Sequence, residues 1–250
     1  KALASAPQHF QALRALTNLE FAAGNLRQAR VYLNRLLEAH DPRDAETLFL
    51  RGNIELSEGM LLQALKSYQR AEAIEGSTPE LEFNKGLVHL MLGHGVDAAA
   101  IFTRLTQLQP ENARTWDALG CALRMTKDFS GATHAFTQAL QCDPALNDAR
   151  DHLAQMLLEM GNPREALTVL EAALAVDDDR ASSHHLRGLA YAALHDYPHA
   201  INCWETRIAR GGAMAETFHL LANAYLQTNN RARAMQVLQT MVAQYPAHLA

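Results

Sequence analysis

The strongest constraint on the fold of this 250-residue chain is a repeat of 34 residues. With one extra residue near Pro42, alanine recurs at this spacing seven times, at Ala29, Ala64, Ala98, Ala132, Ala166, Ala200 and Ala234. An ordinary helical bundle would not keep one phase along its whole length, whereas stacked copies of a small unit do. The phase divides the chain into seven repeats, at residues 10–44, 45–78, 79–112, 113–146, 147–180, 181–214 and 215–248.

Two further positions of the repeat pair a small residue with a large one. The eighth position holds Thr17, Gly52, Gly86, Gly120, Ala154, Gly188 and Ala222, and the twenty-fourth holds Leu33, Tyr68, Phe102, Phe136, Leu170, Trp204 and Leu238. A glycine inside a helix costs about 0.5–1 kcal/mol relative to alanine, so its recurrence at one phase indicates a steric requirement. We predict that two helices of each repeat cross closely at the small residue, beside the large one.

Residues that end or begin helices fall where a two-helix repeat needs them. Gly24, Gly59, Gly93 and Gly161 stand between the two expected helices of a repeat. Residues 77–80 read as a helix start, with Thr78 as a cap and Pro79 in the first turn. No segment has the alternation of a strand, so the sequence predicts an all-α fold.

The stretch from Ala113 to Leu146 resembles the tetratricopeptide repeat family. The resemblance is carried by Trp116, Leu119, Gly120, Phe129, Ala132, Phe136, Ala139 and Pro144. It covers residues 10–248 and is weaker in the first and fifth repeats. It implies a right-handed superhelical solenoid of about seven helix-turn-helix repeats, forming a single domain over residues 1–250 with a concave groove.

In this family the first helix of each repeat lines the groove. The matching residues here include Arg14, Asn18, Phe49, Asn53, Phe83, Asn84, Leu87, Arg114, Asp117, Arg124, Asp151, His152 and Asn223. Some family members hold a partner's C-terminal carboxylates with five amide or basic residues. Asn53, Asn84 and Arg114 match three of these positions, and Phe49 and Ala118 replace the others.

The amides of Asn53 and Asn84 carry donors and acceptors, so they can bond an extended peptide backbone whatever its sequence. We expect Phe49, Phe83 and Arg114 to act as anchors.

The predicted groove differs in charge along its length. Its first half combines apolar side chains with Arg14, Arg114 and Arg124, whereas its second half is acidic, with Asp148, Asp151, Glu159 and Glu216. This pattern predicts a partner segment that is apolar at one end and basic at the other. An alternative is that these charges only cover a solvated surface.

Composition limits the other classes of function. A net charge of −5 argues against nucleic acid as a partner, and no apolar run approaches the roughly 18 residues that membrane insertion needs. We expect no cofactor and no metal, because His195 falls in a turn and His199 on the next helix. Cys121 and His152 stand one repeat apart, but nothing supplies an oxyanion hole, so we expect no enzyme.

The sequence therefore predicts a cytoplasmic scaffold or adaptor that binds an extended or helical segment of another protein. One alternative is the repeat arm of a larger enzyme or of a secretion or assembly machine. The other is a self-assembling scaffold, in which the C-terminal repeat pairs with another copy to give a homo-oligomer. No closing polar helix follows the seventh repeat, which favours a piece of a longer protein over a complete array.

Overall fold

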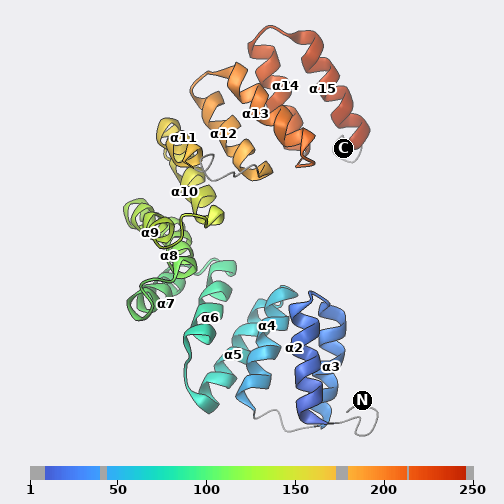
Figure 1. The fold of residues 1–250 in the computed structure, drawn as a ribbon, viewed down its shortest axis with the longest axis vertical. Coiled ribbons are helices and arrows are strands. Elements are labelled where there is room, and N and C mark those ends of the chain that lie inside the picture. Colours follow the sequence, from blue (N-terminus) through green and yellow to red (C-terminus); the bar gives the residue numbers. More distant parts are fainter. Residues whose placement is uncertain (1–8, 40–43, 173–179, 213, 246–250) are drawn as a thin grey trace. The chain divides into compact units, whose positions relative to one another are not determined.

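The computed structural model describes residues 9–39, 44–172, 180–212 and 214–245, and all regular secondary structure within these ranges is helical. Seven helix pairs follow one another along the described chain (Figure 1). They are α2 (Phe10–Ala22) with α3 (Leu26–Ala39), α4 (Ala45–Ser57) with α5 (Leu61–Glu75), α6 (Pro79–Met91) with α7 (Gly95–Leu108), α8 (Ala113–Met125) with α9 (Phe129–Cys142), α10 (Asn147–Glu159) with α11 (Pro163–Glu171), α12 (Ala181–Ala193) with α13 (Tyr197–Ala209), and α14 (Ala215–Gln227) with α15 (Arg231–Gln244). The all-α prediction of about seven helix-turn-helix repeats is confirmed.

The helices fall into two compact units, Lys1–Pro110 and Glu111–Ala250. Within each unit, the first helix of a repeat packs on its own second helix, and that second helix packs on the first helix of the next repeat. This nearest-neighbour packing is what buries the apolar face of a helical repeat. That all seven repeats form a single domain over residues 1–250 stays a prediction.

Close approach of the paired helices explains the small and large residues of the repeat. A methyl group built on Gly52 would lie 2.4 Å from the Tyr68 ring, and one on Gly120 would lie 2.5 Å from the Phe136 ring. The same conflict arises between Gly188 and Trp204. No real side chain tolerates such distances, so the predicted steric requirement for glycine is confirmed.

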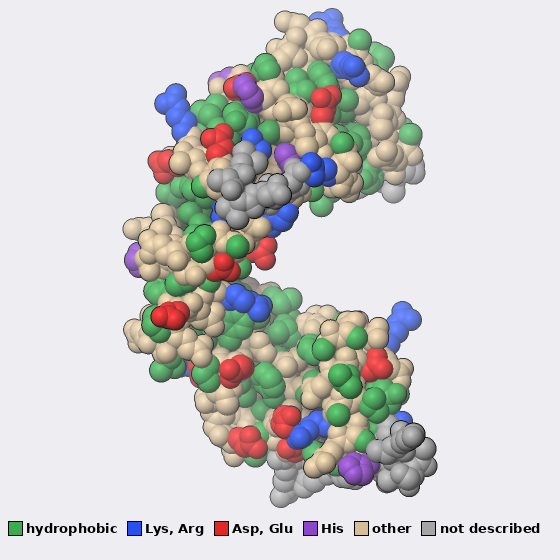
Figure 2. Space-filling model, viewed as in Figure 1, with side chains coloured by type: hydrophobic (Ala, Val, Ile, Leu, Met, Phe, Trp, Pro, Cys, Tyr) green, Lys and Arg blue, Asp and Glu red, His purple; other side chains and the backbone are tan. Residues whose placement is uncertain are grey.

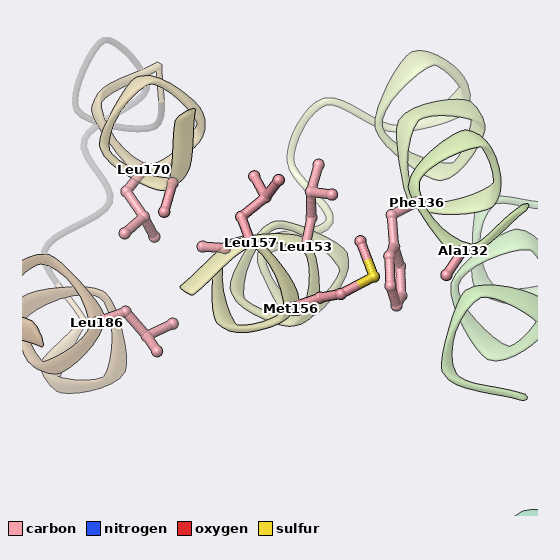
Figure 3. Close-up of a cluster of buried hydrophobic side chains, with 9 residues drawn as sticks. Ala132, Phe136, Leu153, Met156, Leu157, Leu170 and Leu186 are labelled. Atoms are coloured by element: carbon pink, nitrogen blue, oxygen red, sulfur yellow. The ribbon is translucent and has the colours of Figure 1, made fainter. Parts of the chain in front are cut away.

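The core of the second unit shows how the weaker fifth repeat is held. Phe136 of α9, Met156 and Leu157 of α10, Leu170 of α11 and Leu186 of α12 belong to one buried cluster. Figure 3 shows the Met156 side chain reaching toward the Phe136 ring. The fifth repeat is therefore held by contacts with the repeat before it, through Phe136, and with the repeat after it, through Leu186.

The turn within each repeat requires a left-handed residue. Gly24, Gly59, Gly93 and Gly161 lie in these turns, as the sequence predicts, and their φ is between 74° and 80°. The other three turns place Lys127, His195 and Asn229 there, with φ of 63°, 61° and 59°. All three turns of the first unit thus use glycine, whereas three of the four in the second unit do not.

The predicted helix start before α6 is also present. The Thr78 hydroxyl accepts a hydrogen bond from the Leu81 backbone N–H at 3.2 Å, and Pro79 is the first residue of the helix. None of the helices in the described ranges is both long enough and apolar enough to cross a bilayer.

Candidate functional site

In the first unit, two predicted groove residues from neighbouring repeats are hydrogen-bonded to each other. The Asn84 side-chain amide of α6 donates to Asn53 Oδ1 of α4 at 2.8 Å. The Tyr68 hydroxyl of α5 donates to the same oxygen at 2.8 Å. We call Asn53, Tyr68 and Asn84 the amide cluster. Burial raises the pKa of Tyr68, so its hydroxyl keeps its proton and acts as a donor at neutral pH.

Aromatic side chains flank the amide cluster. The Phe49 ring centre lies 5.8 Å from that of Tyr68, and the Phe83 ring packs edge-on against Phe102 at 5.6 Å. Phe49 and Phe83 are both half-buried, as is Leu87. A cavity of about 160 Å³ opens beside Phe49. Its other lining residues are Ala45, Glu46, Ala71, Glu75, Gly76, Thr78 and Leu81.

The two candidates of the first repeat lie differently. Arg14 is half-buried and forms an ion pair with Glu46 of the next repeat at 2.5 Å. Its guanidinium therefore already bridges two repeats. Asn18 is exposed on α2.

In the second unit, the first helices are joined by charged side chains. His152 of α10 contacts Asp117 of α8 at 2.8 Å, and Arg124 of α8 contacts Glu159 of α10 at 3.2 Å. Arg180, which caps the start of α12, contacts Asp151 of α10 at 3.1 Å. We call these six residues the charged row. Five of them, Asp117, Arg124, Asp151, His152 and Glu159, are predicted groove residues, and the structure pairs Asp117 with His152 and Arg124 with Glu159.

His152 is the most perturbed group of the charged row. Its Nδ1 lies 2.8 Å from Asp117 Oδ1 and 3.5 Å from Cys121 Sγ. The hydrogen bond with Asp117, and then that with Cys121, raise the pKa of His152 to about 10, so the ring is charged at neutral pH. Phe136 packs beside the imidazole, with ring centres 5.9 Å apart.

The contact of Cys121 with His152 does not make a hydrolytic triad. In such a triad the base uses one ring nitrogen for the nucleophile and the other for the orienting carboxylate. Here the thiol and the carboxylate of Asp117 both face Nδ1 of His152. The arrangement is therefore suited to sharing a cation among three donors rather than to passing a proton along a chain.

The acidic second half of the predicted groove is largely paired. Arg180 lies 3.5 Å from Asp148 as well as 3.1 Å from Asp151, and Arg124 holds Glu159. Acidic and basic side chains are accordingly interspersed on the face shown in Figure 2. Arg180 is absent from the predicted site because it is the last residue of the fifth repeat, just before α12, the first helix of the sixth.

The remaining candidates of the second unit lie outside the six residues of the charged row. Arg114 on α8 and Asn223 on α14 are exposed, as is the acidic Glu216. His195 lies in the turn before α13 and contacts the Tyr197 hydroxyl, whereas His199 contacts Asp196, the N-cap residue of α13. Neither histidine belongs to a group of three potential metal ligands among the described residues.

Comparison with known families agrees with this geometry. Three family profiles match along the chain: the cytochrome c-type biogenesis protein H TPR domain at residues 98–210, and two tetratricopeptide repeat profiles at residues 14–79 and 216–248. The chain is a tetratricopeptide repeat protein. The TPR fold supports a role as a scaffold for protein–protein interaction.

Similar proteins share the fold at low sequence identity. The TPR protein is 24% identical over 161 residues to anaphase-promoting complex subunit 3 of Schizosaccharomyces pombe, covering 64% of this chain and 24% of that protein. A tetratricopeptide repeat protein from Parabacteroides merdae superposes with a TM-score of 0.71 at 17% identity, over 89% of this chain and 88% of the other.

YrrB, described as a TPR protein with an unusual peptide-binding site, superposes with a TM-score of 0.56 at 20% identity, over 74% of this chain and 94% of the other. These likenesses show the fold alone. The TPR chain spans about a quarter of the length of the S. pombe relative.

Proposed function

We propose that this TPR protein is an adaptor that binds an extended segment of another protein beside the amide cluster. The observation that supports this most directly is the double use of Asn53 Oδ1, which accepts from both Tyr68 and Asn84. Because that oxygen is occupied, the amide N–H groups of Asn53 and the side-chain oxygen of Asn84 are the groups that the cluster can offer to a ligand.

This pair of groups matches the backbone of a peptide. Each peptide unit presents one N–H donor and one C=O acceptor. The Asn84 oxygen can accept from the first and the Asn53 amide can donate to the second. Recognition of this kind is independent of the partner's side chains, and the hydrogen bond between the two asparagines orients both amides before a ligand arrives.

Sequence preference would come from the aromatic neighbours. The cavity beside Phe49, about 160 Å³, is of the size that accepts a benzene-sized apolar group, roughly 150 Å³. A partner side chain such as leucine or phenylalanine would fill it, and the half-buried Phe83 ring would add a second contact. Phe49 and Phe83 are therefore the proposed anchors.

In the second unit we propose a separate contact with a partner at the exposed Arg114. A guanidinium forms charge-assisted hydrogen bonds with a carboxylate, which are about twice as strong as neutral ones. Asn18 and Leu87 complete the proposed binding surface of the first unit, and Asn223 stays a candidate contact of the second unit by itself. Arg14 and the charged row are already paired, so they would contribute to the shape of the surface more than to affinity.

A peptide library displayed on phage tests this proposal. A selected peptide is labelled, and its affinity is measured by fluorescence anisotropy for the wild type and for the Asn53→Ala and Asn84→Ala variants. Each variant should bind about 2- to 10-fold more weakly, the effect of one net hydrogen bond. Asn34→Ala is the matched control, because Asn34 is exposed on the second helix α3. Equal losses in the control, or none in the two variants, would contradict the proposal.

The expectation that the chain is not an enzyme belongs to the same proposal. It is supported by the arrangement of Cys121 and Asp117 on a single nitrogen of His152, which lacks the order of a nucleophilic site. The proposal applies equally to a separate adaptor and to the TPR arm of a larger enzyme or assembly machine. We also keep the cytoplasm as the proposed location.

A second candidate function is self-association through the last helix pair. A cavity of about 510 Å³ is lined by Leu226, Leu238 and the strongly exposed Met235 and Val242. Met235 and Val242 stand one 34-residue repeat after Ile201 and Ile208 of α13, which pack in the cluster that includes α14. The same surface of α15 could therefore receive a first helix from another copy.

Light scattering across a concentration series tests self-association. The wild type should increase in mass with concentration, and Met235→Lys should remain a monomer. Leu62→Lys is the control, because Leu62 is an equally exposed apolar residue on α5. A constant monomer mass for the wild type would exclude this second candidate.

A further inference from the structure

We propose that Asp117, Cys121 and His152 form a binding site for one zinc-like divalent metal ion. The three residues offer a carboxylate oxygen, a thiol sulfur and an imidazole nitrogen within 4.8 Å of one another. This proposal is independent of peptide binding at the amide cluster, which lies in the other unit. It also reverses our expectation from the sequence that the chain holds no metal.

The fold places the three donors without help from a mobile loop. Asp117 and Cys121 are four residues apart on α8, so they project from the same side of that helix. His152 lies on α10, and α8 and α10 are in contact. Two rigid helices of neighbouring repeats therefore supply the whole set.

The distances suit a tetrahedral ion. With zinc–nitrogen and zinc–sulfur bonds of about 2.0 and 2.3 Å, the two ligand atoms stand about 3.5 Å apart around the metal. Cys121 Sγ and His152 Nδ1 are 3.5 Å apart. Asp117 Oδ1 lies 2.8 Å from the same nitrogen, closer than the roughly 3.3 Å of a zinc-bound pair, so its carboxylate would withdraw by about half an ångström on binding.

One atom, His152 Nδ1, is common to both contacts. A single proton on this nitrogen can point at the Asp117 oxygen or at the Cys121 sulfur but not along both directions. A metal ion placed between the three atoms would bond to all of them at once. A metal ion that replaced this proton and that of the Cys121 thiol would satisfy the oxygen, the sulfur and the nitrogen together.

The surroundings hold the ligands while leaving access to them. The Asp117 side chain is 16% exposed and that of His152 is 35% exposed. Phe136 packs beside the imidazole and limits its rotation. With three protein ligands, a tetrahedral ion keeps a fourth position for water or for a donor from a bound partner.

The kinds of donor favour zinc over magnesium or calcium. Thiolate and imidazole ligands select borderline-soft ions, whereas magnesium and calcium take oxygen ligands. Among the described residues, one other group could hold a metal, formed by His89, His94 and Asp97. It has no thiol, and His94 and Asp97 are exposed, so it serves as an internal control.

Titration of the metal-free TPR chain with Co²⁺ alone, and then with Zn²⁺, tests the site. Cobalt bound to a thiolate gives a charge-transfer absorption that oxygen and nitrogen ligands do not give. We expect one Co²⁺ per chain with this absorption, its loss on addition of Zn²⁺, and its absence from the Cys121→Ser variant. His152→Gln should weaken cobalt binding by more than about tenfold.

The controls are Cys142→Ser, a change to a thiol outside the site, and His94→Gln in the other group. Both should bind cobalt like the wild type. Circular dichroism confirms that each variant is folded, and the absorption itself reports the thiolate without reference to stability. A wild type with no thiolate absorption, or an absorption that survives Cys121→Ser, would overturn the proposal.

Discussion

The two units solve the same packing problem but join their first helices differently. In the first unit, α4 and α6 are joined by neutral groups, the amides of Asn53 and Asn84 together with the Tyr68 hydroxyl. In the second unit, α8, α10 and α12 are joined by the charged row, which includes Asp117, His152 and Arg180. An ion pair, between Arg14 of α2 and Glu46 of α4, also joins first helices in the first unit, so the amide cluster is what distinguishes this unit from the second.

This difference shows which parts of a repeat are free to vary. The contact between glycine and a ring recurs as Gly52 with Tyr68 in the first unit and as Gly120 with Phe136 in the second. Ion pairs join first helices in both units, as Arg14 with Glu46 and Arg124 with Glu159, whereas the paired amides of Asn53 and Asn84 belong to the first unit. A surface of neutral amides can bind a peptide backbone without a large desolvation cost, whereas paired charges must lose their partners or their water first.

The largest expected effect comes from removing a buried ring that packs against the glycine of the paired helix. Phe136 is completely buried, and Phe136→Ala should lower the free energy of unfolding by about 3–5 kcal/mol because a large cavity remains. Phe102→Ala in the first unit should have an effect in the same range, since Phe102 is equally buried. Urea unfolding followed by circular dichroism measures both. If either variant lost less than about 1 kcal/mol of unfolding free energy, that would contradict the claim that both units depend on the same glycine–ring packing.

A reversal of sign sharpens the same test. Gly120→Ala alone should destabilise the protein, because its methyl group meets the Phe136 ring. In the Phe136→Ala background that conflict is removed, and Gly120→Ala should stabilise by about 0.5–1 kcal/mol through its better helix propensity.

The next prediction separates the neutral from the charged contacts. Asn84→Ala in the amide cluster and Arg180→Gln in the charged row should each cost about 1 kcal/mol at roughly 0.1 M salt. At about 1 M salt the Debye length falls to roughly 3 Å, so the effect of Arg180→Gln should shrink. The effect of Asn84→Ala should stay constant. Unfolding of both variants at the two salt concentrations measures this, and equal salt dependence would remove the proposed difference between the units.

The sequence predicts the packing of the paired helices better than the side-chain contacts between repeats. The repeat phase places Gly52 opposite Tyr68 and Gly120 opposite Phe136, because backbone approach depends on residue size at a fixed position. It also puts Asp117 and His152 on the same face. It does not predict that they touch, since that contact depends on side-chain torsions and on reach between two repeats.

Long side chains outside the expected positions are missed for the same reason. Arg180 precedes its helix, and Tyr68 belongs to a second helix, yet both reach the contacts between first helices. Their roles follow from the length of the side chain, which a periodic pattern of small and apolar residues does not encode. The left-handed Lys127 is missed as well, because only glycine marks such a turn in a sequence.

The turns give a smaller test of the difference between the units. Lys127→Gly relieves a left-handed residue that carries a side chain, at the cost of a more flexible unfolded chain, so it should stabilise by a few tenths of a kcal/mol. Gly93→Ala in the first unit should destabilise by about 1 kcal/mol. Thermal unfolding of the two variants, with Gln63→Ala as a control on the exposed surface of α5, measures both signs.

The smallest expected effect concerns one ion pair of the first unit. Lys85 of α6 contacts Glu72 of α5 at 2.7 Å, and this hydrogen bond lowers the pKa of Glu72 below its usual 4.5. A lowered pKa in the folded state stabilises the protein above the unfolded pKa, and the contribution is lost as the pH falls through the folded pKa. Because both groups are partly exposed, we expect less than about 0.5 kcal/mol.

Unfolding of the wild type and of Lys85→Gln between about pH 3 and pH 7 measures this contribution. The difference in unfolding free energy should be constant near neutral pH and should decrease below the usual pKa of Glu72, 4.5. The pair joins a second helix to a first helix, whereas the amide cluster joins first helices through neutral groups. Peptide affinity of Lys85→Gln should therefore match that of the wild type while its acid stability changes, which separates the charge that stabilises the first unit from the surface that binds.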